Sequence, residues 1–261
     1  MERGVHIEDR PDGVRALTLS NPKKRNALDP GLLDDLMAAL RKPRADGAKV
    51  RALLLQGAGH TAFCSGYDLA ALDAISAAGP LPDEQLQRAL EALESHDAPS
   101  VAYVAGPAFG AGCELACACD LRVGDPRAVF SMPPARLGIV YAPEGLSRVT
   151  ALVGTSRAKR MFFLAEKLGG EEALRAGLLD VLRPEPEAHA AAEALCAELA
   201  AGAPLAIAGM KRGFRWLASP MRTAEERAEL ERLRRAAYRS ADAREGRAAF
   251  LEKRPPRFTG Q

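Results

Sequence analysis

Two short segments of the chain combine residue types that could do chemistry. They are Ala62–Leu69, with the sequence AFCSGYDL, and Gly106–Leu115, with the sequence GPAFGAGCEL. Small residues where a chain leaves a strand let a ligand approach the backbone closely. A helix that starts just after such a turn presents unpaired N–H groups and the positive end of its dipole. Two such N–H groups aimed at one point would stabilise an oxyanion, although the sequence alone does not show that they converge.

Other catalytic motifs are absent from the sequence. The spacing of Gly106, Gly110 and Gly112 is not that of a GxGxxG dinucleotide turn, and there is no GxxxxGK[ST] or GxSxG. The histidines lie outside both turns, have no nearby nucleophile, and are interpreted as surface or hydrogen-bonded residues: His6, His60, His96 and His189. Carboxylates are therefore the expected acid and base.

The five cysteines are expected to be reduced thiols in a cytoplasmic protein, because their number is odd and none lies in a CxxC pair. They are Cys64, Cys113, Cys117, Cys119 and Cys196. The cluster at 113–119 resembles a metal site at first sight. Its spacing is not that of common ligand sets, so we interpret these cysteines as small buried residues of an Ala-rich helix and expect no metal.

Composition indicates an ordinary globular protein. The 261 residues are 48% apolar and 27% charged, which fits one large domain or a domain with an appendage. A net charge of +2 and only 5% aromatic residues argue against a nucleic-acid partner. No apolar run of about 18 residues occurs, and the N-terminus lacks a signal core, so no membrane association is expected.

Hydrophobic periodicity predicts alternating strands and helices, and so an α/β class. Asp29 and Pro30 are suited to the N-cap and first position of a helix that ends before Pro43. A second helix follows Asp83. The predicted strands are 14–19, 50–55, 101–104, 120–123 and 128–130, and the further helices are 114–119, 156–165, 171–177 and 186–201.

The C-terminal part of the chain differs in pattern and charge. From Pro204 onward only helix is predicted, including the stretch 223–235. From Cys196 the chain contains 14 basic and 8 acidic residues, against 22 basic and 26 acidic before it. We therefore divide the chain into a core, 1–195, and a helical segment, 196–261. The basic segment suits docking, oligomerisation or an anion contact, and a solvated helical face remains an equal alternative.

Along nearly its whole length the chain resembles the crotonase, or enoyl-CoA hydratase/isomerase, superfamily. Seven segments in the family's order carry the resemblance: Asn21–Leu28, Ala62–Leu69, Gly106–Asp120, Arg136–Ile139, Gly154–Lys159, Glu172–Asp180 and Ser240–Gly260. The resemblance implies a spiral of ββα units with a helical C-terminal segment that covers the active site and packs in trimers, often paired as hexamers. It also implies an acyl-CoA substrate, with coenzyme A as part of the substrate and no separate cofactor.

The resemblance assigns roles to residues of the two turns. The backbone N–H groups of Tyr67 and Ala111 would form the oxyanion hole for the thioester carbonyl. Lysine and arginine side chains near the phosphates of coenzyme A would be favourable. The residues that the resemblance places at the substrate are Lys23, Arg25, Ala27, Ser65, Gly66, Asp68, Leu69 and Gly110.

The carboxylates match the family only in part. Glu114 stands at the first family carboxylate, where burial would raise its pKa and the helix dipole would lower it. The second hydratase carboxylate is replaced by Pro134, which cannot transfer protons. Glu144 lies in a loop where some isomerases of the family have their acid/base, although at a shifted position.

These residues favour proton transfer to and from a thioester enolate, by hydration or double-bond isomerisation of an enoyl-CoA, with Glu114 and Glu144 as catalytic residues. Pro134 shifts the expectation towards isomerisation or another specialised reaction. Hydrolysis, dehalogenation, decarboxylation and carbon–carbon cleavage use the same oxyanion hole in the family, so fold alone does not define the reaction. The alternative is a catalytically altered or inactive acyl-CoA-binding protein.

Overall fold

The computed structural model describes residues 1–59, 61–73, 81–218 and 238–254, together with 228, 232, 235, 236 and 256. His60 and most of the predicted helix 223–235 lie outside the described residues. Among the described residues, no single helix is long and apolar enough to cross a membrane. Within the described part of the chain, one bent pair, Glu187–Ala201 and Pro204–Arg215, together has the length and composition of a span.

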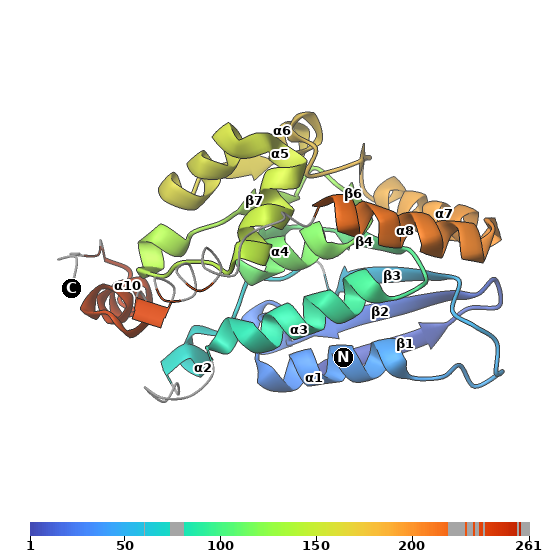
Figure 1. The fold of residues 1–261 in the computed structure, drawn as a ribbon, viewed down its shortest axis with the longest axis horizontal. Coiled ribbons are helices and arrows are strands. Elements are labelled where there is room, and N and C mark those ends of the chain that lie inside the picture. Colours follow the sequence, from blue (N-terminus) through green and yellow to red (C-terminus); the bar gives the residue numbers. More distant parts are fainter. Residues whose placement is uncertain are drawn as a thin grey trace.

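A six-stranded sheet forms the centre of the molecule (Figure 1). Its strands, in spatial order, are β1 (Gly4–Asp9), β2 (Val14–Ser20), β3 (Ala52–Gly57), β4 (Ser100–Val104), β6 (Leu121–Gly124) and β9 (Val181–Leu182). The first two strands pair antiparallel, and the others continue in parallel. The predicted α/β class and the predicted strands near residues 14, 50, 101 and 120 are confirmed, whereas β1 is not among the predicted strands.

Side chains alternate between two apolar clusters on the two faces of this sheet. Leu17, Leu19, Leu53 and Leu55 pack with α1 (Pro30–Arg41) and α3 (Pro82–Ser95), which lie side by side on one face (Figure 1). The residues between them, such as Ala16 and Leu54, pack with α7 (Glu187–Ala201) on the other face. This two-residue period is the pattern of strands that are buried on both faces.

The predicted helix start at Asp29 and Pro30 agrees with the structure. Asp29 is the N-cap of α1, and its carboxylate accepts a hydrogen bond from the Leu32 N–H at 3.0 Å. The predicted helix 156–165 is the second half of a longer helix, α5 (Pro143–Leu164), which Gly154 interrupts with φ 73° and ψ 161°. A glycine tolerates this left-handed φ, so the chain can bend there without strain.

A smaller sheet holds the second Gly-rich turn. It consists of β5 (Pro107–Phe109), β7 (Val129–Ser131) and β8 (Lys167–Gly169). From β5 the chain turns directly into α4 (Ala111–Ala118), every residue of which is buried.

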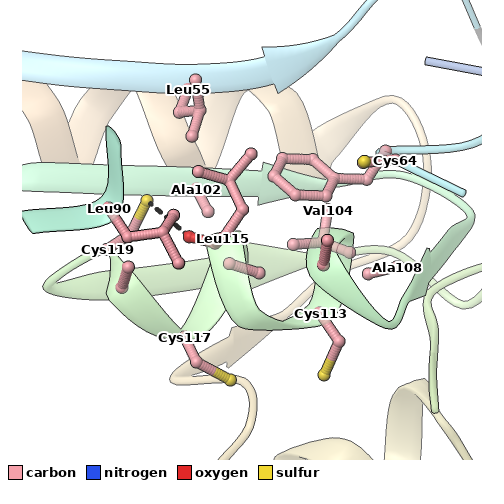
Figure 2. Close-up of a cluster of buried hydrophobic side chains, with 14 of the residues drawn as sticks. Leu55, Cys64, Leu90, Ala102, Val104, Ala108, Cys113, Leu115, Cys117 and Cys119 are labelled. Carbon is pink, nitrogen blue, oxygen red and sulfur yellow. Dashed lines mark hydrogen bonds between the residues drawn. The ribbon is translucent and has the colours of Figure 1, made fainter. Parts of the chain in front are cut away.

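The cysteines of α4 agree with the prediction that they are small buried residues. Figure 2 shows Leu115 pointing towards the strands and Cys113 and Cys117 pointing away from them, with the Cys119 thiol donating to the Leu115 carbonyl. All five cysteines are free and buried. The described residues contain no group of three or more His, Cys, Asp or Glu side chains that could hold a metal ion.

The remaining elements are helical. They are η1 (Pro22–Lys24), α2 (Leu69–Asp73), η2 (Pro134–Leu137), α6 (Gly170–Ala176), α8 (Pro204–Ala218) and α10 (Ala241–Leu251). The boundary that we place at residue 196 falls within α7. Helix α10 packs on η2, and the buried Lys211 of α8 forms an ion pair with Asp120 at 2.7 Å. The C-terminal helices are thus bound to the core at more than one place.

Candidate active site

A short parallel ladder brings the two Gly-rich turns together. The Cys64 N–H donates to the Pro107 carbonyl, and the Phe109 N–H donates to the Cys64 carbonyl, each at 3.1 Å. At the start of α4, Gly112 lies so close to the first turn that a Cβ there would stand 2.3 Å from the Cys64 carbonyl oxygen. Gly66, with φ +114°, also lies close to Phe109, and a Cβ there would stand 3.0 Å from the Phe109 carbonyl oxygen. The glycines therefore allow the two backbones to touch.

The two expected oxyanion donors lie in these adjoining turns. Within the described part of the chain, neither the Tyr67 N–H nor the Ala111 N–H has a hydrogen-bond acceptor. Ala111 is the first residue of α4, where the helix leaves its N–H groups unpaired. The Tyr67 ring packs against the main core, and burial raises the pKa of its phenol to about 12. Both backbone groups are thus available to a ligand oxygen.

Glu114 lies in the first turn of α4 and is fully buried. Its Oε1 accepts hydrogen bonds from Gln87 Nε2 and from Arg148 Nη1, each at 2.8 Å. Its Oε2 is buried and has no partner among the described residues. Burial raises the pKa of Glu114 above its usual value, although Arg148 and Gln87 act in the opposite direction. The carboxyl group is thus held at one oxygen and unpaired at the other.

Three helices define the position of this carboxyl group. Gln87 comes from α3 and Arg148 from α5, and Arg148 Nη1 also donates to Gln87 Oε1 at 2.6 Å. Arg148 binds Glu94 of α3 through two further hydrogen bonds, from Nε at 2.6 Å and from Nη2 at 2.9 Å. Sequence reasoning predicted neither partner of Glu114. A buried carboxylate requires a donor, but the sequence does not show which of 36 basic residues supplies it.

The start of α5 lies against Glu114. A Cβ on Gly145 would stand 2.7 Å from Glu114 Oε1, so the carboxyl group touches this backbone. The preceding residue, Glu144, is in the first turn of α5 and exposed to solvent. The structure therefore brings the neighbour of Glu144 to Glu114 but leaves the Glu144 side chain at the surface. Pro134, at the second hydratase position, is buried at the start of η2.

Tyr141 is a site residue that sequence reasoning missed. A Cβ on Gly110 would meet its hydroxyl oxygen at 3.2 Å, and its ring packs edge-on against Phe162. Burial, and then the negative charge of Glu114, raise the pKa of Tyr141 well above that of a free phenol. Tyr141 is therefore a neutral hydrogen-bond donor beside the second turn. The buried Asp83 of α3 adds a negative charge that acts on Glu114 and Tyr141.

The loop expected to contact coenzyme A is bound to the first turn. The Ser65 N–H donates to the Arg25 carbonyl at 3.1 Å, and the Leu28 N–H donates to the Gly66 carbonyl at 2.8 Å. Lys24 forms an ion pair with Asp68. Of the other predicted contact residues, Lys23 and Arg25 are exposed, Ala27 and Gly110 are buried, and Leu69 begins α2. The structure thus places the Lys24 side chain beside the turn that contains Tyr67 and leaves the side chains of Lys23 and Arg25 exposed.

The contact between Gly145 and Glu114 leads to a first prediction. Gly145→Ala places a methyl group within 2.7 Å of Oε1 and displaces a carboxyl group that Gln87 and Arg148 hold. We expect kcat/KM to fall by about 10²-fold, the effect of a shift of about 1 Å in a catalytic group. Steady-state kinetics of the variant measure this, with thermal unfolding as a check on the fold. Unchanged kinetics would show that Glu114 can move without loss.

Comparison with known proteins agrees with this geometry. The sheet, the two adjoining turns and the buried glutamate define an enzyme of the crotonase fold. The chain belongs to the enoyl-CoA hydratase/isomerase family, because the sequence model of that family matches residues 9–261. The superfamily and the fold class predicted from the sequence are confirmed.

Relatives match the chain over nearly its full length. The "Probable enoyl-CoA hydratase echA6" of Mycobacterium tuberculosis is 38% identical over 249 residues, which cover 95% of this chain and 97% of that protein. The "Probable enoyl-CoA hydratase" of Rhodobacter capsulatus is 37% identical and covers 96% of both. A crystal structure of methylmalonyl CoA decarboxylase complexed with 2S-carboxypropyl CoA aligns over 100% of both chains with a TM-score of 0.90 and 28% identity.

Proposed function

We propose that the protein transfers a proton at C2 of an acyl-CoA thioester and that Glu114 is the acid/base. The observation that supports this most directly is the buried Oε2 of Glu114, which has no partner among the described residues and lies in a site with two acceptor-free N–H groups. The C2–H bond breaks, the proton goes to Oε2, and the electron pair moves onto the thioester oxygen. That oxygen would lie between the Tyr67 and Ala111 N–H groups.

The favoured overall reaction is isomerisation of a 3-enoyl-CoA to a 2-enoyl-CoA. Syn hydration in the family uses two carboxylates on one water, and here Pro134 takes the place of the second. Isomerisation needs only removal of a proton at C2 and return of a proton at C4, and it adds no water. Coenzyme A belongs to the substrate, and the proposal requires no separate cofactor.

The decisive experiment offers crotonyl-CoA and a 3-enoyl-CoA to the protein in heavy water and follows products and deuterium by mass spectrometry. We expect conversion of the 3-enoyl substrate without a water adduct. A water adduct of crotonyl-CoA would instead show hydration. Binding without any deuterium exchange or conversion would leave only the acyl-CoA-binding role.

Glu144 is the proposed second proton-transfer group, at C4. We expect Glu144→Gln to lower the isomerisation rate at least about 10²-fold while deuterium exchange at C2 continues, because Glu114 performs that step. Parallel assays of isomerisation and C2 exchange on the same variant separate the two residues. An unchanged isomerisation rate would remove Glu144 from the mechanism and leave both transfers to Glu114.

Decarboxylation of a 2-carboxyacyl-CoA is a second candidate. The similarity to methylmalonyl CoA decarboxylase over both whole chains favours it. Loss of carbon dioxide also yields a thioester enolate, which then needs one proton at C2, so a single carboxyl group such as Glu114 suffices. Release of carbon dioxide from methylmalonyl-CoA, with no isomerisation of 3-enoyl-CoA, would favour this reaction over the first.

We further propose that the protein assembles as a homotrimer or a pair of trimers. Large apolar side chains are exposed on α5, α8 and α10: Phe163, Leu164, Leu205, Met210, Phe214, Phe250 and Leu251. Patches of this kind mark contacts between proteins. Light scattering during gel filtration measures the mass of the assembly. The free cysteines support a reducing compartment such as the cytoplasm.

A further inference from the structure

Arg148 lies between two carboxylates that differ in burial and in the number of bonds they receive. Glu94 takes two guanidinium hydrogen bonds, at 2.6 and 2.9 Å, and its side chain is 22% exposed. Glu114 takes one, at 2.8 Å, and is fully buried. A two-point arginine–carboxylate pair fixes both direction and position. The geometry of Arg148 is therefore determined mainly by Glu94, with one further bond from Nη1 to Gln87 Oε1 at 2.6 Å, rather than by the proposed catalytic residue.

We propose that Glu94 is a positioning residue of the reaction. It holds Arg148 so that one guanidinium nitrogen reaches Glu114 Oε1 and so that the arginine's charge is shared between two carboxylates. The pKa of Glu114 then stays above its usual value, so that Oε2 can take the C2 proton and return it, whereas an unshared Arg148 would lower that pKa. This inference rests on the proposed role of Glu114 and adds to it the residue that controls its protonation.

The charges around Glu114 support the inference. With Glu94 ionised and Arg148 positive, the buried group is neutral only when Glu114 is protonated, and burial of an unbalanced charge is unfavourable. Among the residues that the structure describes, the other groups facing Glu114 add no cation. They are Asp83 and Gln87 from α3, Cys113 from the same helix as Glu114, and Tyr141 before α5. Tyr238 of the C-terminal segment acts on Tyr141. Glu144, at the start of α5, is exposed.

Removing the charge of Glu94 should therefore favour ionised Glu114. In Glu94→Gln the amide oxygen can still accept one of the two hydrogen bonds from Arg148. The arginine's charge is no longer shared, so the pKa of Glu114 falls. In Arg148→Gln the cation is lost, and the pKa of Glu114 rises. Proton removal at C2 requires ionised Glu114, so the exchange rate increases as pH rises through this pKa. In a plot of exchange rate against pH, the rise at low pH (the low-pH limb) should thus move to lower pH in Glu94→Gln and to higher pH in Arg148→Gln.

The test is the pH profile of C2 hydrogen–deuterium exchange in butyryl-CoA, which does not depend on which overall reaction the enzyme performs. We expect a downward shift of at least about 0.5 pH unit for Glu94→Gln and an upward shift of about 1 unit or more for Arg148→Gln. Glu166→Gln is the matched control, because Glu166 also takes two bonds from one arginine, Arg160 of α5, at 2.8 Å each. Its profile should remain that of the parent.

The outcomes separate this inference from the proposed function. Exchange with opposite shifts in the two variants supports the role of Glu94, since a purely structural loss would lower the rate without moving the limb. Exchange with an unmoved limb in a folded Glu94→Gln variant overturns it and leaves Glu114 in place. Absence of C2 exchange in the parent protein, in the presence of bound butyryl-CoA, overturns the proposed function itself. Thermal unfolding shows whether each variant folds. If Arg148→Gln fails to fold, the pH shift of Glu94→Gln alone decides whether the role of Glu94 holds.

Discussion

Glu114→Gln should lower both isomerisation and C2 exchange at least about 10²-fold, the usual contribution of a general acid–base group. The amide keeps the shape of the carboxyl group, and its oxygen can still accept from Gln87 and Arg148. Only the proton-accepting oxygen, Oε2, is lost. We therefore expect butyryl-CoA to bind with unchanged affinity, measured by calorimetry, while kcat falls.

The matched control for this variant is Glu91→Gln, which changes an exposed glutamate of α3 without touching the site. Its rates should equal those of the parent. Full activity of Glu114→Gln would contradict the mechanism, because no other group of the described residues combines burial with an unpaired carboxylate oxygen.

Gly112→Ala should have the largest effect on stability. The new Cβ would stand 2.3 Å from a backbone oxygen, that of Cys64, and a backbone atom cannot move aside as the end of a side chain can. We expect a loss of at least about 2 kcal/mol in the free energy of unfolding, as in overpacked cores. The start of α4 must move away from the first turn, so activity should fall as well. Denaturant unfolding and kinetics measure the two effects.

A comparable glycine provides the control. Gly169 has φ −72°, and a Cβ there meets nothing within 4 Å. Gly169→Ala should change stability by no more than about 1 kcal/mol, since it replaces only an N-cap glycine. If both variants were equally stable, the close approach of α4 to Cys64 would not be a requirement of the fold.

Much of the fold follows from local patterns. Asp29 and Pro30 mark the start of α1, and the spacing of Leu86, Leu90 and Leu93 gives the buried face of α3. Strand β1 was predictable as well, because Val5 and Ile7 alternate with polar residues. In the smaller sheet, the predicted strand 128–130 is confirmed as β7, whereas β5 and β8 were not predicted, since a pairing of three residues depends on distant partners rather than on its own sequence.

The site was predictable only in part. Glu114, Tyr67 and Ala111 lie in segments that resemble the family, and the structure brings both segments together. Gln87, Arg148 and Tyr141 lie far from these segments in the sequence. Their role arises from the packing of α3 and α5 around α4, which periodicity does not specify. A buried acid in an apolar helix was the one available signal that such partners exist.

The ion network around Glu114 also has a consequence for folding. Its hydrogen bonds join residues 27, 34, 54 and 61 positions apart in the chain. Contacts between such distant segments form only after long loops have closed, so they belong to slow, cooperative steps of assembly. A chain with all its helices formed but with α3 and α5 not yet docked would have the acid without its partners. Recovery of catalysis is therefore a stricter measure of native assembly in this enzyme than recovery of helix content.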